Sequence, residues 1–183
     1  MKPLDPAARP ARPECDVHLA ENVPVPMRDG VHLATDVYRP ARDGRPLPDR
    51  RPVLLHRTPY NKVETEATSG ECRYFAARGY VVVNQDCRGC FGSEGLVNFL
   101  VPEAEDGADT IAWIRAQPWC DGTVGAFGTS WSGWTQTAMA ALGPEGQARG
   151  GDRRPEALGA PARQVPGLNR ARGKWSLHTH PVE

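Results

Sequence analysis

Hydrophobic residues alternate with polar ones near the start of the chain and form short continuous runs further along. Val23, Val25 and Met27 alternate with other residues, and alternation resumes over 31–37 after the turn residues 28–30. A period of two on either side of a tight turn is typical of a β-hairpin with one buried face. We therefore expect a hairpin at the start of the folded part.

Three pairs of one strand and one helix come next along the chain: 52–57 with 64–78, 80–84 with 103–116, and 123–127 with 131–142. The first two strand runs do not alternate, as expected of strands covered on both faces. Strands that alternate with helices predict an α/β fold, here a partial one, with a mostly parallel sheet and flanking helices. A ligand site should lie at the carboxyl ends of its strands.

The remaining segments differ in composition and set the expected domain boundaries. Residues 1–20 begin with a Pro-, Ala- and Arg-rich stretch and should form a disordered lead-in. Residues 21–143 carry the α/β pattern. Residues 144–183 are rich in Gly, Pro and Arg and lack sustained periodicity, so we expect a disordered tail.

Charge and hydropathy exclude some classes of partner and location. The 183 residues suffice for one domain, and 22 Lys and Arg balance 22 Asp and Glu. This balance disfavours nucleic acid and acidic membranes as partners. The chain has no apolar run long enough for a signal peptide or a membrane span, so we expect a soluble, cytoplasmic protein.

The cysteines offer one further motif. Five are present, and Cys87 and Cys90 form a C-x-x-C. That spacing also occurs in redox and zinc sites, but no second pair follows at metal-ligand spacing. We expect reduced, structural thiols, no metal and no cofactor.

The stretch 123–142 places a serine at a sharp corner. Its apolar, β-prone start passes through Gly128-Thr129-Ser130 into a helical pattern. A serine between a strand and a helix is typical of the nucleophile elbow of α/β-hydrolases, where small neighbours let the two backbones approach. The alternative is a serine that caps the helix N-terminus.

Four blocks in order resemble a known family. They are VPMRDGVHLATDVYRP (25–40), HRTPYNK (56–62), DCRGCFGSEG (86–95) and WCDGTVGAFGTSWSGWTQ (119–136). Together they resemble the cocaine esterase / X-prolyl dipeptidyl-peptidase-like (CocE/NonD) serine hydrolases. The resemblance covers about residues 22–143, the N-terminal part of the family's α/β-hydrolase domain.

The resemblance implies roles for three residues. Ser130 matches the nucleophile, and Tyr60 matches a tyrosine whose hydroxyl stabilises the oxyanion. The backbone N–H of Trp131, which stands where the family commonly has tyrosine, would be the second oxyanion donor. Without the resemblance, Tyr60 would be an ordinary loop tyrosine at the solvent edge.

A second set of residues matches the family's glycine-rich loop. We expect these residues to shape the site rather than to react, through loop hydrogen bonds or an Asp86–Arg88 contact. They are Asp86, Arg88, Ser93 and Glu94.

The general base is left unassigned. In α/β-hydrolases the acid and the histidine follow the serine after further strands, and each βα unit takes on the order of 30 residues. Residues 143–183 do not read as such units and resemble a frameshifted terminus. His178 and His180 are the remaining candidates for the base and Asp152 for the acid, in a segment where nothing fixes them.

Three functions follow from these observations. The first is a serine hydrolase that cleaves small-molecule esters or peptide-like bonds through an acyl-enzyme at Ser130. The second is a truncated, non-catalytic homologue with an exposed sheet edge, covered in an oligomer or by a partner. The third is a binding module whose basic tail meets an acidic partner.

Overall fold

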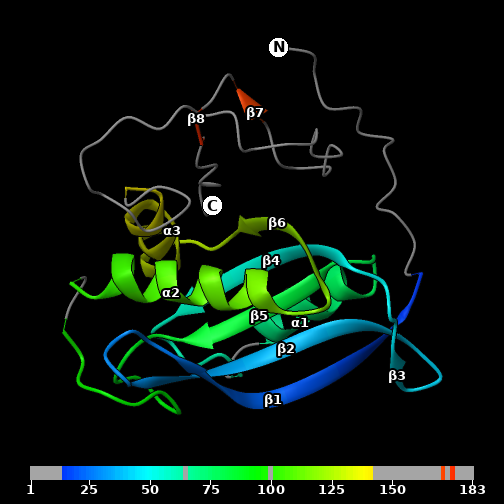
Figure 1. Cartoon of the computed structure of the whole chain (residues 1–183), viewed down its shortest axis with the longest axis horizontal. Helices are drawn as coiled ribbons and strands as arrows, with labels where there is room; N and C mark the ends of the chain where they lie inside the picture. The colour runs from blue at the N-terminus through cyan, green and yellow to red at the C-terminus, as the bar shows by residue number, and fades with distance from the viewer. Residues whose placement is uncertain (1–13, 64–65, 99–100, 142–169, 172–173, 176–183) are drawn as a thin grey trace.

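A computed structural model describes residues 14–63, 66–98, 101–141, 170–171 and 174–175 (Figure 1). Its elements are β1 (Asp16–Pro26), β2 (His32–Arg42), β3 (Arg45–Pro46), β4 (Arg51–Thr58), α1 (Glu66–Ala76), β5 (Val81–Asp86), α2 (Glu103–Ala116), β6 (Cys120–Ala126), α3 (Trp131–Ala141), β7 (Arg170–Ala171) and β8 (Lys174–Trp175). Most of the expected tail, with His178, His180 and Asp152, lies outside the described residues.

The main sheet is mixed and has the strand order β1-β2-β5-β4-β6. β1 and β2 form the expected antiparallel hairpin, and β2 pairs antiparallel with β5. β4 pairs parallel with both β5 and β6. The α/β prediction is confirmed, and because β4, β5 and β6 run the same way, the loops that follow them meet at one end of the sheet.

Helices cover both faces of the sheet. On one face α2 and α3 pack over a cluster that includes Val53, Leu55 and Val83. On the other face α1 packs its Cys72 and Ala76 against alternate residues of the same strands. Figure 1 shows α2 in front of the sheet and α1 behind it. Since β4 and β5 are buried on both faces, their sequences lack alternation, as expected.

The hairpin starts earlier than the sequence predicts. β1 begins at Asp16, so residues 16–20 are strand, where the sequence analysis assigns them to a disordered lead-in. Pairing explains the difference, because Asp16 lies opposite Ala41 and the ladder runs on to Ala20. A bulge follows, and its residue Asn22 has a φ of 53°. The strand is thus fixed by a distant partner rather than by its own composition.

Two further observations concern the limits of the fold. None of the helices in the described ranges is long and apolar enough to cross a bilayer. β6 ends the path of the sheet, and among the described strands only β4 pairs with it.

Candidate active site

A tight turn between β6 and α3 places Ser130 at its apex. Ser130 is exposed and has a φ of 56°, in the left-handed region that residues with a side chain rarely adopt. Gly128 has a φ of 145°, and a Cβ there would lie 2.6 Å from the Cβ of Ser132. Glycine is therefore required where the strand and helix backbones approach. The turn leaves the Ser130 hydroxyl in the open at the carboxyl end of β6.

Tyr60 reaches Ser130 from the loop after β4. The Tyr60 hydroxyl oxygen lies 3.4 Å from Ser130 Oγ, where either group could donate, and Tyr60 is 51% exposed. The Tyr60 backbone N–H donates to Thr58 Oγ1 at 3.1 Å, which fixes the start of the loop. The structure thus brings together the two side chains that the family resemblance pairs, across 70 residues of sequence.

Lys62 anchors the loop that carries Tyr60. Its backbone N–H donates to Asp86 Oδ1 at 2.8 Å, and its ammonium lies 3.3 Å from Asp86 Oδ2. The ammonium also donates to Asn22 Oδ1 at 2.8 Å and lies 3.7 Å from Asp36. The Asn84 side chain donates to the Lys62 carbonyl at 2.8 Å. These contacts tie the loop to the end of β5 and to the bulge of the hairpin.

The glycine-rich loop after β5 is held by its own polar contacts. The Ser93 hydroxyl donates to the Asp86 carbonyl at 2.7 Å and accepts from the Ala34 N–H at 2.9 Å. Glu94 accepts from the His32 backbone N–H at 2.8 Å, and this bond is the main reason that the Glu94 pKa is lowered. Ser93 and Glu94 thus bind the loop to β2, beside the site.

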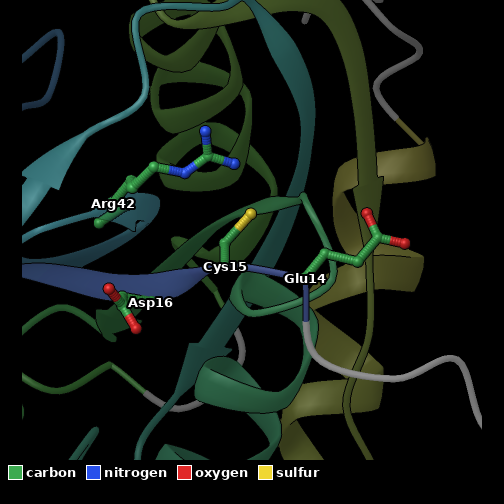
Figure 2. Close-up of a pocket in the computed structure, with 5 residues that line it drawn as sticks. Glu14, Cys15, Asp16 and Arg42 are labelled. Atoms are coloured by element: carbon green, nitrogen blue, oxygen red, sulfur yellow. The ribbon is translucent and has the colours of Figure 1, made fainter.

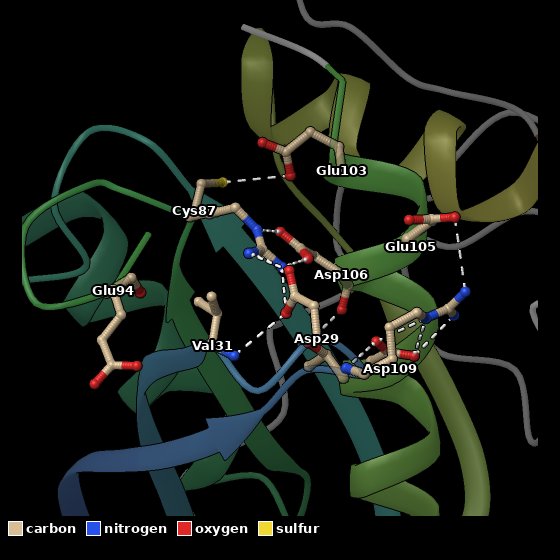
Figure 3. A network of polar contacts seen from close by, with 12 residues as sticks. Asp29, Val31, Cys87, Glu94, Glu103, Glu105, Asp106 and Asp109 are labelled. Atoms are coloured by element: carbon tan, nitrogen blue, oxygen red, sulfur yellow. Dashed lines mark hydrogen bonds and ion pairs between the residues drawn. The ribbon is translucent and has the colours of Figure 1, made fainter. Parts of the chain in front are cut away.

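Of the two alternatives expected for this loop, the structure shows loop hydrogen bonds rather than a contact between Asp86 and Arg88. Arg88 instead donates to Asp106 on α2 at 2.6 Å and to Asp29 in the hairpin turn at 2.7 Å. Asp86 is already engaged by Lys62, whereas the carboxylates near the start of α2 need a cation. Figure 3 shows Asp29 and Asp106 lying side by side at this point. Arg88 therefore links the loop to α2 and the hairpin.

A buried ion pair that sequence reasoning missed lies under the site. Arg57, at the end of β4, is fully buried, and its Nη1 lies 2.8 Å from Glu103 Oε2. Arg57 Nε donates to Gln85 Oε1 at 2.8 Å. The signal available in the sequence was an arginine at the end of a buried apolar run, which needs a carboxylate partner inside the fold.

Burial favours the neutral form of the two thiols beside the site. All five cysteines are free. Burial raises the pKa of the Cys87 thiol, and Cys87 Sγ donates to Glu103 Oε2 at 3.6 Å. Burial also raises the pKa of Cys90. A thiol held in its neutral form is a poor nucleophile and a poor metal ligand. This favours the interpretation of Cys87 and Cys90 as reduced, structural thiols.

His56, on β4, gives a pH dependence that can be measured. Its Nδ1 lies 2.9 Å from Asn84 Oδ1, and burial lowers its pKa below 6.5. As pH falls below 6.5, His56 takes up a proton in the unfolded chain before it does so in the folded chain. His56 therefore lowers the free energy of unfolding, by at most about 1.4 kcal/mol per pH unit. Urea unfolding on both sides of pH 6.5 measures this slope.

The variant His56→Gln supplies the control for this dependence. It keeps a group that can donate to Asn84 but cannot be charged, so it should flatten the slope below pH 6.5. An equal slope in wild type and variant would contradict the assignment to His56.

A pocket of about 280 Å³ lies away from Ser130, and Figure 2 shows the residues that line it. They include Cys15 and Asp16 at the start of β1 and Arg42 at the end of β2. Cys15 donates its N–H to the carbonyl of Ala77, just after α1. The pocket is therefore at the amino-terminal end of the parallel strands and takes no part in the Ser130 site.

Comparison with known proteins identifies relatives of the chain. The family model for X-Pro dipeptidyl-peptidase (S15 family) matches residues 29–148. The cocaine esterase of Rhodococcus sp. (strain MB1 Bresler) is 49% identical over 131 residues, which are 70% of this chain and 22% of that protein. The chain thus spans about a fifth of the length of the curated relatives it matches.

Solved structures share the fold. An α-amino acid ester hydrolase is 30% identical, with a TM-score of 0.56 over 76% of this chain and 26% of the other. A CocE/NonD family hydrolase from Staphylococcus aureus is 26% identical, with a TM-score of 0.59 over 69% of this chain and 25% of the other.

Proposed function

Because the chain belongs to the X-Pro dipeptidyl-peptidase (S15) family of hydrolases, we propose that it cleaves ester or peptide-like bonds of small molecules through an acyl-enzyme on Ser130. The observation that carries this proposal is the exposed Ser130 hydroxyl, on a strained turn, beside the Tyr60 hydroxyl at 3.4 Å. A strained serine between a strand and a helix has the geometry of a nucleophile elbow.

The reaction has two steps. Ser130 Oγ attacks the acyl carbon and gives its proton to a base, and the carbonyl oxygen becomes an oxyanion. The Tyr60 hydroxyl and the Trp131 backbone N–H donate to that oxyanion. The intermediate then expels the alcohol or amine, which takes the proton from the base, and water repeats the sequence to release the acid.

The general base stays unassigned. Among the described histidines, His56 is buried and bonded to Asn84, and none contacts Ser130. His178 and His180 lie in the segment that the structure does not describe, as does Asp152. A partner that covers the outer side of β6 likewise stays a prediction.

Labelling with a fluorophosphonate tests the proposal. The probe reacts with serines that are activated by a base, and mass spectrometry of the digested protein locates the adduct. We expect the adduct on the peptide that carries Ser130, together with turnover of a chromogenic acyl ester. A folded chain without adduct or turnover would contradict the proposal and favour the non-catalytic alternative.

Tyr60→Phe tests the oxyanion donor. This change removes only the hydroxyl, and because Tyr60 is exposed, the fold should be unaffected. Loss of one preorganised donor typically lowers kcat by about 10²–10³-fold. We expect that loss in kcat for the chromogenic ester with KM nearly unchanged. Equal kcat in the two proteins would contradict the oxyanion role and leave Tyr60 as an ordinary loop tyrosine at the solvent edge.

A further inference from the structure

Glu103 lies at the meeting point of the three loops that surround Ser130. It is the first residue of α2 and is 2% exposed. Its Oε2 accepts from Arg57 at the end of β4 and from Cys87 after β5. Its Oε1 accepts from the indole Nε1 of Trp131 at 3.3 Å. One buried carboxylate therefore links β4, the loop after β5 and the turn after β6.

The turn at Ser130 needs such an anchor. A residue with a side chain at positive φ persists only where its surroundings fix the backbone. On one side of the turn, Gln136 Nε2 donates to the Gly128 carbonyl at 3.1 Å. On the other side, the Trp131 indole is held by Glu103. The peptide that joins Ser130 to Trp131, with the N–H proposed for the oxyanion, lies between these two restraints.

We propose that Glu103 is a positioning residue, which orients the Trp131 backbone N–H by holding the indole. This inference rests on the proposed function of Ser130. Arg57 makes the geometry rigid, because it bonds both the side chain and the backbone carbonyl of Glu103, the latter at 2.9 Å. A carboxylate with one oxygen fixed by a buried guanidinium presents the other oxygen in a defined direction.

The first measurement concerns the contact itself and needs no activity. In a ¹⁵N-labelled chain, Trp131→Phe identifies the indole N–H resonance of Trp131 by its disappearance. In Glu103→Gln the weaker acceptor should move this resonance upfield and speed its exchange with water by about tenfold. Glu105→Gln is the matched control, since the Glu105 side chain is 66% exposed on the same helix. It should leave the resonance in place.

The second measurement concerns the reaction. Trp131→Phe keeps an aromatic ring and the Glu103–Arg57 pair but removes the indole N–H. We expect fluorophosphonate labelling of Ser130 to slow by about tenfold in Trp131→Phe and in Glu103→Gln, because small misplacements of a reacting group are costly. The double variant should be no slower than Trp131→Phe alone, since the link is already broken.

The outcomes separate the two proposals. An unchanged indole resonance in Glu103→Gln, or additive effects in the double variant, overturns the positioning role while labelling of wild type upholds the proposed function. A wild-type chain that shows the protected indole but no label overturns the proposed function, and the positioning role with it. Thermal unfolding of each variant identifies slower labelling that is caused by loss of fold.

Discussion

Ser130→Ala is expected to abolish covalent labelling and to lower ester turnover to a small residual rate. Removal of the serine of a serine hydrolase lowers kcat by roughly 10⁶-fold, because the covalent route is lost. The substitution removes one exposed oxygen atom and leaves the backbone path unchanged, so the folded structure should persist. Competitive labelling and initial rates with the chromogenic ester measure the loss.

Ser132→Ala is the matched control for this prediction. Ser132 follows two residues later, at the start of α3, and is buried. Its Cβ, which packs against Gly128, is retained in the variant. We expect Ser132→Ala to keep both label and turnover. Label that persists in Ser130→Ala would place the reactive serine elsewhere. Label that disappears equally in Ser132→Ala would contradict the assignment of the loss to the Ser130 hydroxyl alone.

The elements of the fold could be predicted because their patterns are local. α2 begins and ends at the expected residues, since acidic residues precede an apolar stripe and Pro118 follows its end. The hairpin is confirmed for the same reason, because its alternation flanks a turn. The start of β1 at Asp16 was missed, because pairing with Ala41, rather than local composition, makes it a strand.

In the candidate site, too, the local features could be predicted and the long-range contacts could not. Gly128 and Ser130 mark a turn that a short stretch of sequence determines, and their positive φ angles accord with it. The partners that hold the site are distant in sequence: Arg57 and Glu103 are 46 residues apart, and Lys62 and Asn22 are 40 apart. The hydrophobic pattern of the sequence does not predict such pairs, because the register of the strands and the path of the loops decide which side chains meet.

Lys62→Met is expected to lower the free energy of unfolding by about 3–5 kcal/mol at neutral pH, the usual cost of leaving buried charges unpaired. The variant removes the ammonium that faces Asp36 and Asp86, both of which are buried. The methionine fills much of the same volume, so loss of packing contributes little. Urea unfolding of the two proteins measures the difference.

The pH dependence of this loss distinguishes a charge effect from a packing effect. Burial already raises the pKa of Asp36 above 3.8, and Lys62 opposes that rise, so Lys62→Met should raise it further. A folded carboxyl with a raised pKa takes up a proton before the unfolded chain does, so the penalty is full above the folded pKa and shrinks as pH falls through it. We expect the free energies of unfolding of wild type and Lys62→Met to converge at acidic pH. Asp36→Asn, added to Lys62→Met, should recover part of the loss at neutral pH. A loss that stays constant with pH would mean that Lys62 holds the Tyr60 loop by packing rather than by charge.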